Sequence, residues 1–265
     1  MKSVKNIVLI VFAVIALAGA TTVARFQGTT QKNVRGQIQE EATVITEGQM
    51  TEKKRQHSKL FKHVGPKLSD IAAKQKGDVE VEEEVGDVIR LPEPAQRPPV
   101  FQSALCNADV VVIGTLVDKS SQLTDEGNFI FTDYEITVEE VIKNNVTAPI
   151  AVRNNITATR DGGVVQLNDR IFRAKRADFD PLLPGQRYLL FLRSVPSTDS
   201  YLMYGNGVFQ LKDRKVFALG PGAREALVKR GSNEEDSFLN EIRAYATNGC
   251  QHRLNLAAIQ TLEAH

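Results

Sequence analysis

Apolar side chains recur at every second position in one stretch of this chain. Tyr134, Ile136 and Val138 alternate with charged or hydroxyl residues over 133–139. Successive side chains of a strand point to opposite faces, so a period of two with one polar face predicts a half-buried antiparallel strand. This alternation constrains the fold class most strongly, and we expect a mainly β protein.

Further strands are expected at short intervals after residue 100. Asp109–Val117 is a β-branched run, and Arg187–Leu192, which follows the turn dipeptide Pro184-Gly185, is placed at the centre of the sheet. Gly, Pro, Asn and Asp between the strands favour a small antiparallel Greek-key barrel with flanking helices, with a β-sandwich as the alternative. The expected strands are 109–117, 129–142, 150–153, 164–167, 187–193, 201–204, 207–212 and 215–219.

Local features are also predicted. Phe129 and Phe131 lie on the opposite phase from Tyr134, which predicts a bulge near Thr132. Residues 118–128 and 170–176 are expected to be loops. Residues 101–107 are expected to be helical. Residues 232–235 have the spacing of a capping box ahead of an amphipathic helix that ends at Gly249, and a weaker helix is expected at 254–262.

The amino terminus has the pattern of an export signal. Two lysines precede an unbroken run of apolar or small residues over 7–20, which closes in Ala18-Gly19-Ala20. This pattern predicts a signal peptide at 1–20, and an uncleaved anchor that extends to about Val23 is the alternative. We therefore expect an exported protein, periplasmic or extracellular, with inner-membrane anchoring as the alternative.

Residues 21–99 form a polar, partly helical segment that ends in a linker. Lys53–Lys76 contains eight Lys or Arg against one acid, and Asp78–Glu93 contains seven acids against one Arg. Such blocks can fold onto each other or bind a charged partner, although a solvated helix and tether is the simpler interpretation. Apolar residues at helical spacing, interrupted by Gly65-Pro66, predict two short helices. Residues 79–81 and 85–91 are expected to form a short strand. Four prolines over 92–99 form the linker, so we expect a barrel domain at 100–220 and packed carboxyl-terminal helices at 221–265.

Composition restricts the partners and the redox state. The chain has 33 Lys and Arg against 32 Asp and Glu, a balance that argues against nucleic acid as a partner. An exported chain with two cysteines, Cys106 and Cys250, predicts one disulfide, and two buried thiols are the alternative.

Several segments resemble a known family. They are Cys106–Thr115, Tyr134–Lys143, Gly162-Gly163 and Pro184–Leu192. Together they resemble secreted bacterial domains with the OB-like barrel of tissue inhibitors of metalloproteinases and netrin modules. The resemblance implies a five- or six-stranded Greek-key barrel flanked by helices, a fold that hosts binding faces more often than catalysis. The inhibitory chemistry is not implied, because those inhibitors chelate zinc through an amino-terminal cysteine and Cys106 is internal.

Catalytic and cofactor motifs are weak in this sequence. All four histidines lie outside the expected strands, so a Ser-His-Asp arrangement on the barrel would need a histidine brought in from a helix or tail. No zinc motif occurs, Gly162-Gly163 lacks the lysine and helix of a phosphate loop, and we expect no metal and no cofactor. The carboxylates Asp178 and Asp180 carry the alternative hypothesis, a periplasmic or secreted hydrolase.

The strongest candidate site is a compact basic segment. Arg170, Arg173, Lys175 and Arg176 lie within seven residues around one aromatic residue. They fit an anionic envelope polymer or lipid headgroup, with a solvated excursion between strands as the alternative. The sequence therefore favours a non-enzymatic interaction domain of the cell envelope, whose partner is an envelope protein or an anionic polymer.

Overall fold

The computed structural model describes residues 42–44, 51–61, 65–74, 77–83, 100–167, 170–176 and 179–250. All of them belong to the compact unit Glu40–His265. The expected leader, the proline linker and the helix at 254–262 lie outside these residues. Strands and helices of the described residues are β1 (Thr43–Val44), α2 (Glu52–Ser58), α3 (Leu68–Lys74), β2 (Val79–Glu83), α4 (Val100–Asn107), β3 (Val110–Leu123), β4 (Ile130–Lys143), β5 (Asn155–Asp161), β6 (Gly163–Leu167), β7 (Arg170–Arg176), β8 (Arg187–Val195), β9 (Ser200–Lys212), β10 (Lys215–Ala218), α5 (Pro221–Arg230), α6 (Glu235–Ala244) and the π-helical turn Tyr245–Gly249.

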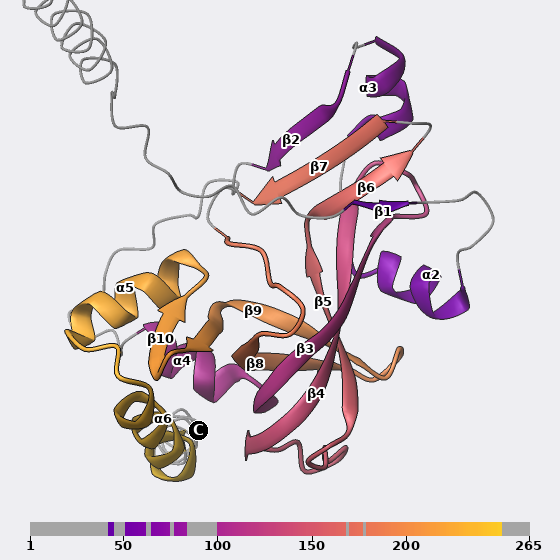
Figure 1. Ribbon diagram of the computed structural model, residues 1–265. Coiled ribbons are helices and arrows are strands. Elements are labelled where there is room, and N and C mark those ends of the chain that lie inside the picture. Colours follow the sequence, from indigo (N-terminus) through magenta and orange to yellow (C-terminus); the bar gives the residue numbers. More distant parts are fainter. Residues whose placement is uncertain are drawn as a thin grey trace, which may run out of the picture. The chain divides into compact units, whose positions relative to one another are not determined.

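The main sheet closes on itself. Its strand order is β10-β9-β5-β4-β3-β8, and β8 also pairs with β9. Five strands therefore form a closed ring, β3-β4-β5-β9-β8, in which only β5 and β9 run parallel. This connectivity is that of an OB-like Greek-key barrel, and it confirms the mainly β fold with flanking helices (Figure 1).

Two hydrophobic layers explain the apolar run at the start of β3. Val110 and Val112 point into the barrel and join the cluster of Tyr134 and Ile136. Val111 and Ile113 point outward, where α4, α5 and α6 cover β3, β8 and β9 in a second cluster (Figure 1). A strand that is buried on both faces reads as a continuous apolar run, whereas a half-buried strand alternates.

Several expected boundaries are wrong. β3 continues to Leu123 through the expected loop, because Ser120 and Gln122 pair with Asp133 and Phe131 of β4. Residues 150–153 contain a turn and no strand, and the strand is β5, which begins at Asn155. The expected strands at 201–204 and 207–212 are one continuous strand, β9, and α5 opens the helical part expected at 221–265, ahead of the helix predicted after residue 232.

The bulge expected near Thr132 is absent from the β3–β4 pairing, whose register shifts lie elsewhere. Phe129 and Phe131 are buried by a residue from outside the barrel: the ring of Phe61, just after α2, lies 6.2 Å and 5.3 Å from theirs. The two phenylalanines thus have the opposite phase because Phe61, which follows α2, packs on the outer face of the barrel.

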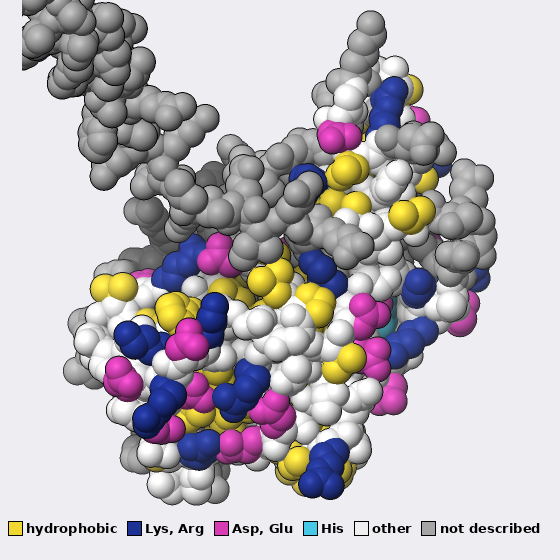
Figure 2. All heavy atoms as spheres, in the orientation of Figure 1, with side chains coloured by type: hydrophobic (Ala, Val, Ile, Leu, Met, Phe, Trp, Pro, Cys, Tyr) yellow, Lys and Arg dark blue, Asp and Glu magenta, His cyan; other side chains and the backbone are white. Residues whose placement is uncertain are grey.

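The last helix begins later than the capping-box spacing predicts. Glu234 is the N-cap residue of α6 and makes no side-chain cap, while Ser232 Oγ accepts a hydrogen bond from the amide of Glu234. Ion pairs hold α6 to the barrel instead: Arg243 donates to both carboxylate oxygens of Glu140 at 2.7 and 2.8 Å. Acidic and basic side chains are interspersed over the region of α5, α6 and β10 (Figure 2).

Candidate functional site: the β6–β7 hairpin and its surroundings

The hairpin of β6 and β7 is an excursion between β5 and β8, and hydroxyl groups anchor it to the barrel. Thr132 Oγ1 donates to the carbonyl oxygen of Gly162 at 2.7 Å, and Ser121 Oγ accepts from the amide of Val164 at 3.3 Å. A Cβ atom on Gly163 would lie 2.2 Å from Thr132 Oγ1, and its φ is 142°. Glycine is therefore required where the hairpin leaves the barrel.

Both edges of the hairpin are covered by strands from the amino-terminal part of the chain. The sheet order is β1-β6-β7-β2, and both outer strands run parallel to their neighbours. Beneath the sheet, Leu68 of α3 packs with Val165 and Phe172. The acidic block that was expected to be part of a solvated tether thus supplies the strand β2, which pairs with the basic strand β7.

The pairing of β2 with β7 matches charge along the register. Glu80 stands opposite Arg173, Glu82 opposite Lys175 and Glu83 opposite Arg176. At the start of the pair, Asp78 Oδ1 accepts a hydrogen bond from the amide of Ile171 at 3.2 Å. Three of the four basic positions of β7 thus stand opposite acidic positions of the same chain in the register.

The four basic residues expected to form one binding patch lie on a strand and not in a loop. Because side chains alternate along a strand, Arg170 shares the face of Phe172, and Arg173 lies on the other face. Phe172 is buried in the hairpin core, and Arg170 and Arg173 are half-buried. The structure therefore places these two arginines of the predicted patch on opposite faces of β7.

The structure describes one of the two carboxylates considered for hydrolysis. Asp180 is an exposed partner of Arg224, whose Nη2 lies 2.7 Å from Asp180 Oδ2. Asp178 lies outside the described residues. Asp180 is therefore an exposed carboxylate that joins the segment before β8 to α5 through an ion pair.

A histidine does reach the barrel from a helix, which the sequence did not reveal. His57 of α2 is completely buried, and its Nδ1 lies 2.9 Å from Oδ1 of Asp133. Oδ2 of Asp133 also accepts a hydrogen bond from Gln122 Nε2 at 3.2 Å. The His57 Nε2 has no partner among the described residues. A completely buried imidazole cannot meet a substrate, so this pair docks α2 on β4.

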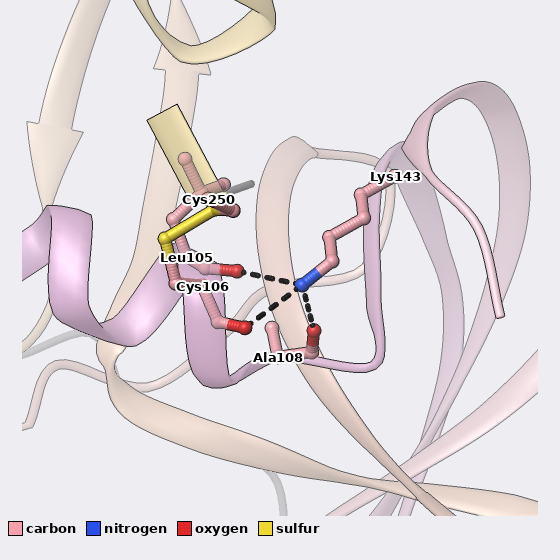
Figure 3. Close-up of a disulfide and its surroundings, with 5 residues drawn as sticks. All are labelled: Leu105, Cys106, Ala108, Lys143 and Cys250. Carbon is pink, nitrogen blue, oxygen red and sulfur yellow. Dashed lines mark hydrogen bonds between the residues drawn. A yellow bond between two sulfur atoms is a disulfide. The ribbon is translucent and has the colours of Figure 1, made fainter. Parts of the chain in front are cut away.

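The predicted disulfide is present. Cys106 at the end of α4 is bonded to Cys250, with the two Cα atoms 5.3 Å apart. Beside it, Lys143 Nζ donates to the carbonyl oxygens of Leu105, Cys106 and Ala108 at 3.2, 2.9 and 2.5 Å (Figure 3). Burial lowers the pKa of this lysine. A cation on the last carbonyls of a helix satisfies acceptors that have no intrahelical partner.

No group of three or more His, Cys, Asp or Glu that could hold a metal ion occurs within the described ranges. In the same part of the chain, no helix is both long and apolar enough to cross a bilayer. The chain matches no known family model and no curated protein.

Proposed function

We propose that this protein is an exported, non-enzymatic interaction domain of the cell envelope that binds an acidic segment of a partner protein along β7. The observation that carries the proposal is the register of β2 on β7, in which the three acidic positions 80, 82 and 83 stand opposite the three basic positions 173, 175 and 176. The chain itself thus provides an example of the ligand: an extended acidic peptide that pairs as an added strand.

A peptide is favoured over an anionic polymer because β7 recognises β2 through its backbone as well as its charge. The five paired positions are held by the hydrogen bonds of a parallel ladder, which a polysaccharide or a polyphosphate cannot form. Export is supported by the disulfide, since such bonds persist outside the cytoplasm. Mass spectrometry of the mature amino terminus distinguishes a cleaved leader from an anchor.

A relationship to the barrels of metalloproteinase inhibitors and netrin modules is part of this proposal. The closed five-stranded connectivity with packed helices supports it. Inhibition through an amino-terminal cysteine is not proposed, because the Cys106 amine is part of a peptide bond.

The test uses a fluorescent peptide with the sequence of residues 77–84 and a matched peptide with Gln and Asn in place of its acids. Replacing Glu80, Glu82 and Glu83 with Gln in the mature chain removes the charge of β2, which competes with the peptide for β7. We therefore expect the acidic peptide to bind this variant at least tenfold more tightly than it binds the wild type. In that background, replacing Arg170, Arg173, Lys175 and Arg176 with Ser should abolish binding.

The matched control also removes four positive charges, from exposed residues away from β7. It replaces Arg153, Arg193, Lys212 and Lys215 with Ser, and we expect it to bind the peptide unchanged. Equal affinity of the two four-residue variants would contradict the site. Capture of an anionic polymer and no acidic protein from the native envelope fraction would contradict the class of partner.

A further inference from the structure

The barrel has one weak junction, between β5 and β9. These strands pair only at Ala158 with Tyr201 and at Thr159 with Leu202, whereas β3 and β4 pair over most of their length. The strand β5 continues to Arg160 and Asp161 beyond the last of these pairs. The two strands therefore separate at Arg160.

Arg160 points toward the inside of the barrel at this junction. It has the same phase as Ile156 and Ala158, which belong to the interior cluster. Only 9% of its surface is exposed. Its guanidinium carbon lies 4.3 Å from the centre of the Phe179 ring, a distance typical of a cation–π contact.

The guanidinium of Arg160 is buried without a carboxylate partner among the residues that the structure describes. Its Nε and Nη1 atoms are buried and have no hydrogen-bond partner among the described residues. Arg187, Arg224 and Arg243 each have a carboxylate within 3.2 Å. A buried charge is costly unless it is paired, and a cation–π contact offsets only part of that cost. Arg160 thus has unmet capacity to bind an anion.

Glycines hold Phe179 over this charge. A Cβ on Gly205 would lie 2.9 Å from the ring, and a Cβ on Gly220 would lie 2.6 Å from it. The amide of Asp180 donates to the carbonyl oxygen of Leu219 at 3.1 Å and fixes the following residue. The aromatic ring is half-buried, so it is the group that an entering anion would displace.

We propose that Arg160 and Phe179 form a binding site for one oxyanion, a carboxylate or a phosphate, at the junction of β5 and β9. The guanidinium supplies charge-assisted N–H donors, and Phe179 covers the site when it is empty. The site is independent of β7, since Arg160 lies on β5 and Phe179 in the segment before β8, and its ligand is a single anionic group.

Binding is measured by calorimetric titration of the mature protein with inorganic phosphate and, separately, with citrate, at constant ionic strength in chloride. We expect saturable binding by the wild type and at least tenfold weaker binding by Arg160→Gln. The matched control is Arg193→Gln, an exposed arginine of β8, which should bind as the wild type does. A response to phosphate alone identifies a phosphate site, and a response to citrate alone identifies a carboxylate site.

The melting temperature provides a second measurement, which separates anion binding by Arg160 from a role in packing alone. Because Arg160→Gln removes an unpaired buried charge, the variant should melt at or above the wild-type temperature in chloride and show no further rise in phosphate or citrate. A lower melting temperature in chloride, with anion binding unchanged, would show that Arg160 serves only to pack against Phe179. Equal anion binding by wild type and Arg160→Gln would overturn the proposal.

Discussion

Nδ1 of His57 lies 2.9 Å from Oδ1 and 3.0 Å from Oδ2 of Asp133, although the two residues are 76 positions apart in the chain. The contact joins α2 to β4, and Phe61 completes it by stacking on Phe131 at 5.3 Å. Residues 51–61 are thus part of the folded unit.

Replacing Asp133 with Asn should lower the free energy of unfolding by about 1–3 kcal/mol, because a buried donor loses its charged acceptor. Urea denaturation measures the change, and limited proteolysis should cut the segment 51–61 faster. Arg55→Ala is the control: Arg55 is half exposed and pairs with Glu52 on the helix surface, so its loss should cost less than about 0.5 kcal/mol. Equal effects of the two substitutions would contradict the docking role.

Replacing both Cys106 and Cys250 with Ser should lower the free energy of unfolding by about 2–5 kcal/mol, since the bond closes a loop with a sequence separation of 144. Denaturation with and without reductant measures this, and reductant should have no further effect on the double variant. Thiol titration of the unfolded, unreduced wild type should find no free thiol. Two free thiols would contradict the bond.

Burial raises the pKa of Tyr188 to about 12. Its hydroxyl accepts from the amide of Leu183 at 2.7 Å and donates to the carbonyl oxygen of Leu183 at 3.3 Å. Because this pKa is raised in the folded state, the contribution of the protonated Tyr188 to the free energy of unfolding is complete below the ordinary pKa of 10.0. This contribution is lost as the pH rises toward about 12. Tyr188→Phe should therefore lose stability less steeply than the wild type over this range. Parallel curves in alkaline urea denaturation would contradict the assignment.

The hydrogen bonds from Arg243 lower the pKa of Glu140 below its ordinary value of 4.5. A lowered carboxyl pKa contributes stability above the ordinary value, and this contribution is lost as pH falls through the folded-state pKa. Glu140→Gln should thus be less stable than the wild type at neutral pH, and the difference should shrink in acid. Thermal melts across acidic pH measure it, with the surface acid Asp236→Asn as control. A difference that stays constant with pH would contradict the ion pair.

Local periodicity predicted a strand correctly where its apolar side chains face the barrel interior. Tyr134, Ile136 and Val138 alternate because one face of β4 meets the barrel interior there. The same rule failed at Phe129 and Phe131, because the residue that packs on them, Phe61, comes from the segment after α2, far away in the sequence. Residues 170–176 were expected to form a loop because basic side chains are usually solvated. They form the strand β7 because β2 and β6 pair with it on its two sides.

The candidate sites were less accessible to prediction than the fold. The basic residues of β7 stand out in the sequence, but their acidic neighbours on β2 are set by a parallel pairing that leaves no local signal. Arg160 has no distinguishing pattern, and only the burial of its guanidinium beneath Phe179 marks it.

The sequence alone determined the mainly β character, the apolar run of β3 and the pair of cysteines available for a bond, because these follow from side-chain spacing and composition. The tertiary structure decided which strand edges meet, how the barrel closes through β8 and β9, and which charges pair. The contact of Glu140 with Arg243 spans 103 positions. Such partners are selected by the packing of whole elements, which the spacing of neighbouring residues does not encode.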